Sequence, residues 1–197
     1  MAITAAQVKE LRDLTDAGIM DCREALTNCN GDVQKAKDYL RQKGAAKAEK
    51  KAARTTSEGR IGYYIHHNGK LGVMVEILCE TDFVAKNDKF QELMKEMSMQ
   101  IAANSPEYVS REQVPAEYIA KEHAGYLEAA IAEGKKPEIA EKIATGKVDK
   151  YLEGICLMEQ GFFRDETIKV KDYVKSVIGV LGENIVIRRF VRMAVGE

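Results

Sequence analysis

Apolar residues recur every three or four positions over residues 1–44 and predict three short helices. Thr4 and Gln7 have the spacing of a capping box, which satisfies backbone amides that a helix leaves unpaired at its start. Asn30-Gly31 supplies a left-handed turn before the third helix, and Gly44 occupies a usual C-terminal stop position. The positions expected to face inward are Val8, Leu11, Leu14, Cys22, Ala25, Leu26, Val33, Ala36, Tyr39 and Leu40. We therefore expect a three-helix module over residues 1–44.

Residues 45–59 contain no large apolar side chain and are predicted to form a linker. Alanine and lysine favour helix, so we expect a solvated helical start that loosens toward Gly59. Its basic residues could neutralise phosphates, but no aromatic residue is interleaved among them for base stacking. A solvated linker is therefore favoured over a nucleic-acid contact.

From Arg60 onward apolar residues alternate with a period of two, which predicts a β-hairpin. A two-residue turn at Asn68-Gly69 would pair Ile65 with Gly72 and place the two apolar sets on opposite faces. A three-residue loop over residues 67–69 would instead pair Ile65 with Leu71 and place both sets on one face. Core burial favours the three-residue loop.

The helical period returns after Asn87, with Phe90, Leu93, Met94, Met97 and Ile101 on one face. Pro115 and Pro137 are placed to begin two further helices, which Gly134 separates into a helical hairpin. A last helix ends near Leu181, and residues 184–195 read as a closing strand. Two strands alone are marginally stable, so the closing strand should join the earlier hairpin. The predicted fold class is α+β, with a small antiparallel sheet covered by helices over residues 60–197.

Thr81-Asp82-Phe83-Val84 falls between the predicted strand and the helix that begins near Asp88. Neither flanking element obviously requires Phe83 for its packing. Burial of a Phe side chain contributes about 1.5–3 kcal/mol, so a pocket on a partner could be its destination. Alternatively, Phe83 folds back under its own sheet, which the usual burial of aromatic residues favours.

Composition and charge exclude several classes of function. Lys and Arg number 30 against 31 for Asp and Glu, which leaves no field to attract nucleic acid or an anionic membrane. Four scattered cysteines without a CxxC pair, and three histidines, predict no zinc site and are typical of a reducing compartment. No run approaches the roughly 18 apolar residues of a membrane span, and the N-terminus carries no secretion signal. We therefore expect a cytoplasmic protein with no membrane contact.

A search for catalytic motifs favours an interaction protein over an enzyme. The sequence has no phosphate-binding glycine loop, no HExxH helix, no GxSxG elbow and no convincing pair of carboxylates. We therefore expect no catalytic residue, no metal ligand and no cofactor.

Four blocks, in this order and spacing, resemble the elongation factor Ts family from end to end. They are Gly18-Ile19-Met20-Asp21-Cys22, the Ala/Lys linker, Thr81-Asp82-Phe83-Val84-Ala85-Lys86-Asn87, and residues 182–190, which run from Gly182 to Phe190. The resemblance implies a guanine nucleotide exchange factor that promotes GDP release from elongation factor Tu during translation. It also implies that residues 1–44 form a ubiquitin-associated-like fold.

The resemblance assigns roles to particular residues. Thr81, Asp82, Phe83 and Val84 would form the segment that disturbs the magnesium site of the GTPase, with Phe83 as the inserted wedge and Asp82 as its polar neighbour. The N-terminal positions that would contact the GTPase are Lys9, Arg12, Ile19 and Met20. Ile19 departs from the methionine often found there, although its apolar character is kept.

The length of the chain leaves room for one core unit, as in the short form of the family. A second copy could supply the half that longer relatives duplicate, so we expect a homodimer with an isologous interface. Two alternatives remain: an adaptor that binds its partner through residues 1–44, and an enzyme with an unrecognised site. A nucleotide-exchange assay separates the three.

Overall fold

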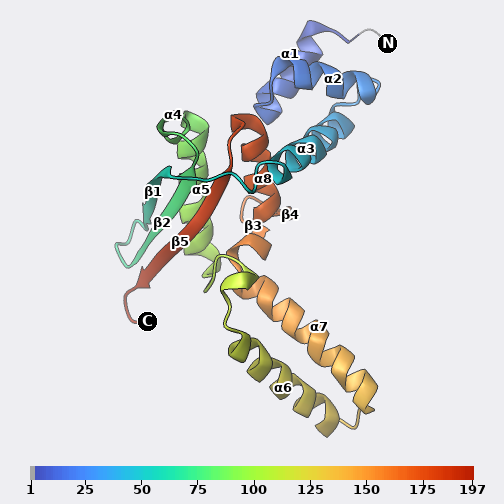
Figure 1. The fold of residues 1–197 in the computed structure, drawn as a ribbon, viewed down its shortest axis with the longest axis vertical. Coiled ribbons are helices and arrows are strands. Elements are labelled where there is room, and N and C mark those ends of the chain that lie inside the picture. Colours follow the sequence, from blue (N-terminus) through green and yellow to red (C-terminus); the bar gives the residue numbers. More distant parts are fainter. Residues whose placement is uncertain (1–2) are drawn as a thin grey trace. The chain divides into compact units, whose positions relative to one another are not determined.

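The computed structural model describes residues 3–197, so Met1 and Ala2 of the predicted 1–44 module lie outside the described residues. Helices and a small antiparallel sheet confirm the predicted α+β class (Figure 1). The chain divides into two compact units. Unit 1 holds the chain up to Gly62 with residues 76–96 and 172–187, and unit 2 holds residues 63–75, 97–171 and 188–197. The predicted division at residues 44 and 59 stays a prediction.

Unit 1 begins with three helices, α1 (Ala5–Thr15), α2 (Ile19–Asn28) and α3 (Val33–Glu49). The capping box of Thr4 and Gln7 is present, as predicted. Asn30 and Gly31 have φ angles of 53° and 85°, which confirms the left-handed turn. The small core between these helices consists of Leu11, Cys22, Ala25, Leu26 and Ala36.

Gly44 does not end the third helix, so that prediction is wrong. α3 continues to Glu49, and Gly44 packs against Gly179 of α8 (Val170–Leu181). A Cβ atom on Gly179 would lie 2.8 Å from the Cα atom of Gly44, closer than real Cβ contacts. Glycine is present here because two helix backbones approach closely, which is a use of glycine other than helix termination.

The three-stranded sheet has the order β1 (Glu58–Ile65), β2 (Leu71–Cys79) and β5 (Ile185–Ala194), so the closing strand joins the hairpin as predicted (Figure 1). The predicted three-residue loop is wrong. The His66 amide donates to the Leu71 carbonyl at 2.8 Å, which places Ile65 opposite Gly72. The Ile65 Cδ1 atom accordingly lies 3.0 Å from where a Cβ on Gly72 would stand. The apolar sets of the two strands therefore face opposite sides.

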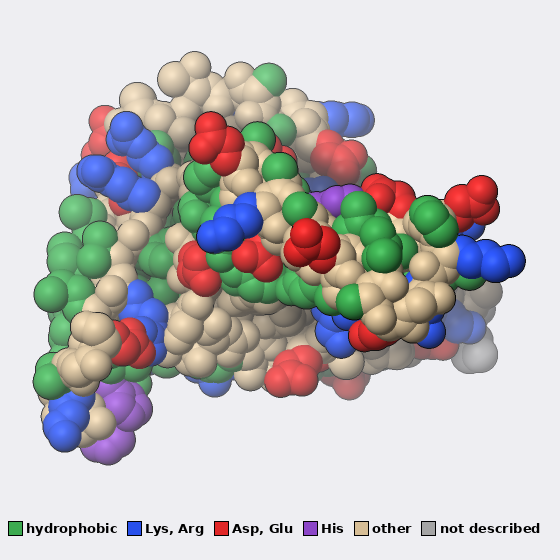
Figure 2. Space-filling model, turned by 90° about the horizontal axis from the view of Figure 1, so that it is seen from below, with side chains coloured by type: hydrophobic (Ala, Val, Ile, Leu, Met, Phe, Trp, Pro, Cys, Tyr) green, Lys and Arg blue, Asp and Glu red, His purple; other side chains and the backbone are tan. Residues whose placement is uncertain are grey.

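The register leaves one face of the sheet without cover in unit 2. Inward residues of β2, such as Val73 and Val75, are buried, whereas alternate residues of β1 and β5 are exposed. We call this exposed set the open sheet face; it consists of Tyr63, Ile65, Met74, Val191, Met193 and Val195. Figure 2 shows hydrophobic side chains gathered at the left edge of the view, next to the purple histidines of the β1–β2 loop. The prediction failed because it assumed that both apolar sets belong to one core.

Helix α5 (Asp88–Asn104) supplies core residues to both units. In unit 1, Phe90 and Leu93 are fully buried, as is Ile77 of β2. In unit 2, Met97 and Ile101 are fully buried. The buried α5 residues are among those that the helical period of the sequence predicted.

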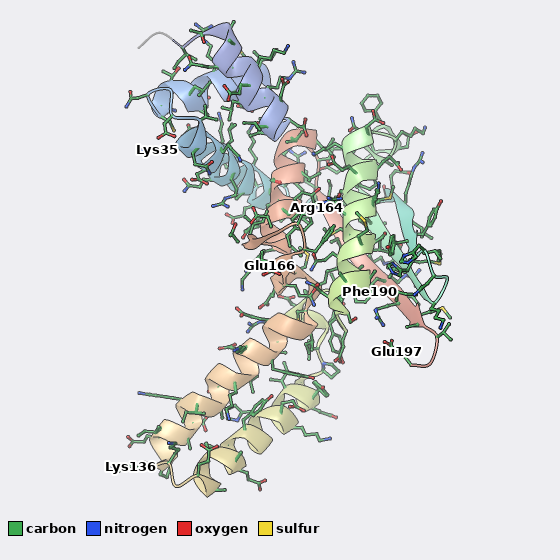
Figure 3. All side chains as sticks on the ribbon, turned by 180° about the vertical axis from the view of Figure 1, so that it is seen from behind. Lys35, Lys136, Arg164, Glu166, Phe190 and Glu197 are labelled. Carbon is green, nitrogen blue, oxygen red and sulfur yellow. The ribbon has the colours of Figure 1, made fainter. Side chains whose placement is uncertain are left out.

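Unit 2 also contains the predicted helical hairpin, formed by α6 (Ala116–Ala132) and α7 (Pro137–Ile155). Pro115 is the N-cap of α6, Pro137 is the first residue of α7, and Gly134 lies in the turn between them with a φ of 79°. Lys136 marks this turn in Figure 3. The hydroxyl groups of Tyr118 and Tyr151 lie 2.5 Å apart and join the two helices. The hairpin was predicted correctly because prolines and a glycine define its boundaries locally.

A second, two-stranded sheet was not predicted. It consists of β3 (Gly161–Phe162) and β4 (Asp165–Lys169). Unit 2 also has two short 3₁₀ helices, η1 (Arg111–Gln113) and η2 (Leu157–Glu159). The side chain of Gln100, fully buried, fixes this region. Its Nε2 donates to Gln160 Oε1 at 3.1 Å and to the Gly161 carbonyl at 3.0 Å, while its Oε1 accepts from the Phe163 amide at 2.8 Å.

Replacing Gln100 with Leu is expected to lower the free energy of unfolding by about 2–4 kcal/mol, because buried partners lose their hydrogen bonds and each unpaired group costs about 1–3 kcal/mol. Urea denaturation measures the change. The matched control is Gln34→Leu on the exposed side of α3, expected within about 0.5 kcal/mol of wild type. Equal midpoints for both variants would show that the Gln100 network contributes little.

Candidate functional site

The segment Thr81–Val84 follows β2 directly and opens a one-turn helix, α4 (Asp82–Ala85). Thr81 is the N-cap: its hydroxyl oxygen accepts from the Val84 amide at 3.3 Å. Asp82 places a carboxylate in the first turn, where the helix dipole favours negative charge. A threonine cap followed by an aspartate therefore explains why the chain turns into helix here.

Phe83 lies on the outer side of this turn. Its side chain is 78% exposed, whereas Val84 and Ala85 are 6% and 3% exposed. Successive residues of a helix point in directions about 100° apart, so Val84 and Ala85 can pack inward while Phe83 faces outward. Seven residues later, Phe90 is fully buried. In this structure Phe83 does not fold back under its own sheet.

The base of α4 is held by Glu183, in the loop between α8 and β5. One carboxylate oxygen accepts from the backbone amides of Glu80 and Thr81, at 3.2 and 3.0 Å. The other accepts from the Thr81 hydroxyl at 2.7 Å. Glu183 belongs to the closing block that the sequence analysis used only for the resemblance. Its contact with Thr81 was missed because the two residues are 102 positions apart in the sequence.

Residues of the predicted linker, 45–59, contact the same loop between α8 and β5. The Asn184 side chain donates to the carbonyls of Ala52 and Arg54, at 3.3 and 2.9 Å, and Lys51 donates to the Gly182 carbonyl. Glu80 accepts from the Asn184 amide at 2.6 Å, and this bond, with Arg54 at 3.4 Å, holds the pKa of the Glu80 carboxyl below its usual range. The segment after α3 is therefore bound to the loop that carries Glu183.

Two ionisable groups, one in the segment and one just before it, have shifted pKa values. Asp82 pairs with Lys86 at 2.7 Å, and this exposed pair lowers the pKa of the Asp82 carboxyl. Burial raises the pKa of the Cys79 thiol to about 11, so Cys79 is protonated near neutral pH. Over residues 3–197, no group of three His, Cys, Asp or Glu side chains is arranged to hold a metal ion.

The four predicted N-terminal contact residues, Lys9, Arg12, Ile19 and Met20, are all exposed. Ile19 and Met20 are large apolar residues that are 56% and 74% exposed to solvent. Leu14, expected to face inward, is 55% exposed, so that prediction is wrong. Helical spacing identified its face, but α1 ends one residue later. Leu14 is therefore a candidate contact residue that the sequence analysis missed.

Within the part of the chain that the structure describes, no helix is long and apolar enough to cross a membrane. The four cysteines are free, and three of them, Cys22, Cys79 and Cys156, are buried.

Comparisons with known proteins identify the family. The family described as Elongation factor TS matches residues 8–197. The elongation factor Ts of Solidesulfovibrio magneticus is 56% identical over 196 residues, covering 100% of this chain and 98% of that protein. That of Geobacter sulfurreducens is 52% identical over 197 residues, covering 100% of this chain and 91% of that protein. The chain belongs to the elongation factor Ts family.

Membership confirms the resemblance that the four sequence blocks carried. The family match begins at residue 8, within α1, and includes the segment Thr81–Val84. High coverage on both sides also shows that these relatives are close to this chain in length. The roles of Thr81, Asp82, Phe83, Val84, Lys9, Arg12, Ile19 and Met20 remain predictions, which the geometry above makes specific.

Proposed function

We propose that this member of the elongation factor Ts family releases GDP from elongation factor Tu by inserting Phe83 beside the magnesium and phosphate site of the GTPase. Membership of the family gives the chain its role as nucleotide exchange factor in translation elongation. The observation that supports the wedge is the exposure of Phe83, 78%, on a short helix anchored at its base. An apolar ring held in water gains about 1.5–3 kcal/mol when a pocket buries it.

The mechanism involves only non-covalent contacts. Mg²⁺ bridges the phosphates of a bound nucleotide, so displacing its ligands weakens the hold on GDP. Asp82 directly precedes Phe83 in α4, and its exposed carboxylate, paired with Lys86, can contact polar groups around that site. No bond is made or broken, and we propose no catalytic residue, metal ligand or cofactor in this chain.

The affinity of the GTPase for this factor and its affinity for GDP are thermodynamically linked. If the factor weakens GDP affinity by some ratio, GDP weakens the binding of the factor by the same ratio. Phe83 can therefore promote GDP release only through contacts that are more favourable in free energy with the nucleotide-free GTPase than with the GDP-bound GTPase.

A second contact through the N-terminal helices would hold the two proteins together while Phe83 acts. Lys9 and Arg12 supply positive charge, and Ile19 and Met20 supply exposed apolar surface. Leu14 adds to that surface. We assign affinity mainly to these residues and the rate of GDP release mainly to Phe83.

The experiment is GDP dissociation from purified elongation factor Tu. The protein is expected to accelerate release of labelled GDP at substoichiometric concentration, because each molecule can act repeatedly. Heat-denatured protein serves as the control. No acceleration at any concentration would refute the exchange role. Binding to elongation factor Tu without acceleration would favour an adaptor.

We further propose that the protein is a cytoplasmic homodimer that does not bind nucleic acid directly, with the open sheet face as its isologous interface. That face presents three large side chains, Tyr63, Met193 and Val195, with 74%, 71% and 76% of their surface exposed. Exposed apolar patches of this kind mark interaction sites. Two such faces related by a twofold axis could pack as the layers of a β-sandwich do.

The variant Met74→Glu tests this interface, because it places a charge near the centre of the open sheet face. The wild-type protein is expected to sediment at twice the 22.0 kDa mass of the chain, and the variant at that mass. An uncompensated buried charge should weaken association by at least about tenfold. Ile139→Glu, on the exposed side of α7, is the control and should leave the mass unchanged. A wild-type species of 22.0 kDa at all working concentrations contradicts the dimer.

A further inference from the structure

We propose that Glu183 is a positioning residue for nucleotide exchange: its carboxylate fixes Thr81 so that α4 presents Phe83 to the GTPase. This inference rests on the proposed function of Phe83. Glu183 does not touch the partner in this account, and it acts only through the orientation of α4.

A chain of hydrogen bonds runs from Glu183 to Thr81 and on to Val84, which flank Phe83 in the sequence. The Thr81 hydroxyl donates its only proton to Glu183 at 2.7 Å, so its lone pairs are left to accept from the Val84 amide at 3.3 Å. The Thr81 amide also donates to Glu183, at 3.0 Å. The carboxylate therefore sets both the direction in which α4 starts and the rotamer of its N-cap. Phe83 lies between the two ends of this path.

A single turn of helix needs such an anchor. α4 has four residues, and isolated helices of that length are unstable because forming the first turn fixes several residues for one hydrogen bond. Bonds to a charged acceptor are stronger than bonds between neutral groups. Inward packing of Val84 and Ala85 secures one side of the turn, and Glu183 secures its start.

The loop that carries Glu183 is itself fixed by bonds that do not involve Thr81. Asn184 holds the carbonyls of Ala52 and Arg54, and its amide donates to Glu80 at 2.6 Å. Gly182 has a φ of 77°, a conformation suited to glycine, and its carbonyl accepts from Lys51. Glu183 is therefore held in place by contacts that do not depend on α4. Glu183 can therefore fix the orientation of Thr81, since its own position does not depend on the contact with Thr81.

The test measures two quantities: the rate of GDP release at a saturating concentration of the factor, and the factor concentration that gives half of that rate. Glu183→Ala is expected to lower the saturating rate about tenfold, as expected for the loss of charge-assisted bonds. The half-saturating concentration should change less than about twofold, because the N-terminal helices keep their contacts. Glu183→Gln, which retains one acceptor oxygen, should recover part of the rate.

A double-mutant cycle with Phe83→Ala shows whether the effect passes through the ring. If Glu183 acts through Phe83, adding Glu183→Ala to Phe83→Ala should change the rate by less than about twofold. Glu49→Ala is the matched control: it removes a carboxylate that pairs with Lys175 at 3.1 Å in the same unit. An unchanged saturating rate for Glu183→Ala, or a tenfold loss that persists without Phe83, would overturn the proposal.

A second measurement uses the protein alone and does not depend on exchange activity. Amide hydrogen exchange at Thr81 and Val84 should become at least about tenfold faster in Glu183→Ala, since local opening of α4 becomes easier. Thr81→Val should reproduce the faster exchange at Val84, and Thr81→Ser should restore protection. If these amides stay protected in Glu183→Ala, the inference fails even where the wild type accelerates GDP release. If wild type does not accelerate release, the proposed function fails instead.

Discussion

Replacing Phe83 with Ala is expected to slow factor-promoted GDP release by about 10- to 100-fold while leaving the fold intact. The side chain is 78% exposed, so its removal opens no cavity in its own subunit. Burial of a Phe ring in a partner contributes about 1.5–3 kcal/mol, and each 1.4 kcal/mol corresponds to about a tenfold change in rate. The loss should appear in the saturating rate, because the ring is proposed to act on the nucleotide site.

Stopped-flow release of fluorescent GDP measures this effect, and thermal unfolding checks that the variant is folded. Ile139→Ala is the matched control, since Ile139 is an exposed apolar residue of the α6–α7 hairpin, 49% exposed. It should release GDP at the wild-type rate. Equal rates for Phe83→Ala and wild type would remove the wedge from the mechanism.

The second large effect is expected for Gly59→Ala, which should lower the free energy of unfolding by about 2–6 kcal/mol, the sum of backbone strain and overpacking. Gly59 is the second residue of β1 and has a φ of 151°, which side-chain-bearing residues rarely adopt. A Cβ atom there would lie 2.3 Å from the Ile77 carbonyl oxygen and 2.8 Å from the Leu78 Cα atom. Because these neighbours are backbone, they cannot rotate away.

Thermal unfolding gives the measurement, with a melting temperature lower by about 4–24 °C expected for a chain of this size. Gly125→Ala is the control, since Gly125 lies within α6 and nothing stands within 4 Å of an added Cβ. That variant should be more stable by about 0.5–1 kcal/mol, since alanine favours helix. Similar melting temperatures for Gly59→Ala and wild type would mean that β1 pairs differently from the structure described here.

Much of the fold could be predicted because its signals are local. The capping box at Thr4, the prolines that begin α6 and α7, and the buried stripe of α5 each depend on residues within a few positions of one another. The closing strand was also placed correctly, because two strands alone would be marginal.

The errors came from contacts that the sequence does not reveal. Gly44 looked like a helix stop, but its partner Gly179 lies 135 positions further along the chain (179 minus 44). The hairpin register was predicted from the assumption that Tyr63 and Ile65 share a core with Val73, whereas both lie on the open sheet face. Local pattern identifies which residues share a face, but not whether another element covers that face.

The candidate site was predicted in part. Sequence blocks identified Thr81–Val84. Phe83 is exposed, whereas Phe90, seven positions later, is fully buried, and only the three-dimensional packing explains this difference. The anchor Glu183 was missed for the same reason as Gly179, since it approaches from the far end of the chain.

The most direct test of the account is to ask what Phe83 touches in the complex. A photo-reactive benzoylphenylalanine at position 83 should crosslink to nucleotide-free elongation factor Tu within peptides that surround its magnesium and phosphate site, and saturating GDP should suppress the crosslink. The same probe at Ile139 should not reach those peptides. A crosslink from position 83 to another region of the GTPase, or none while the complex forms, would contradict the proposed wedge.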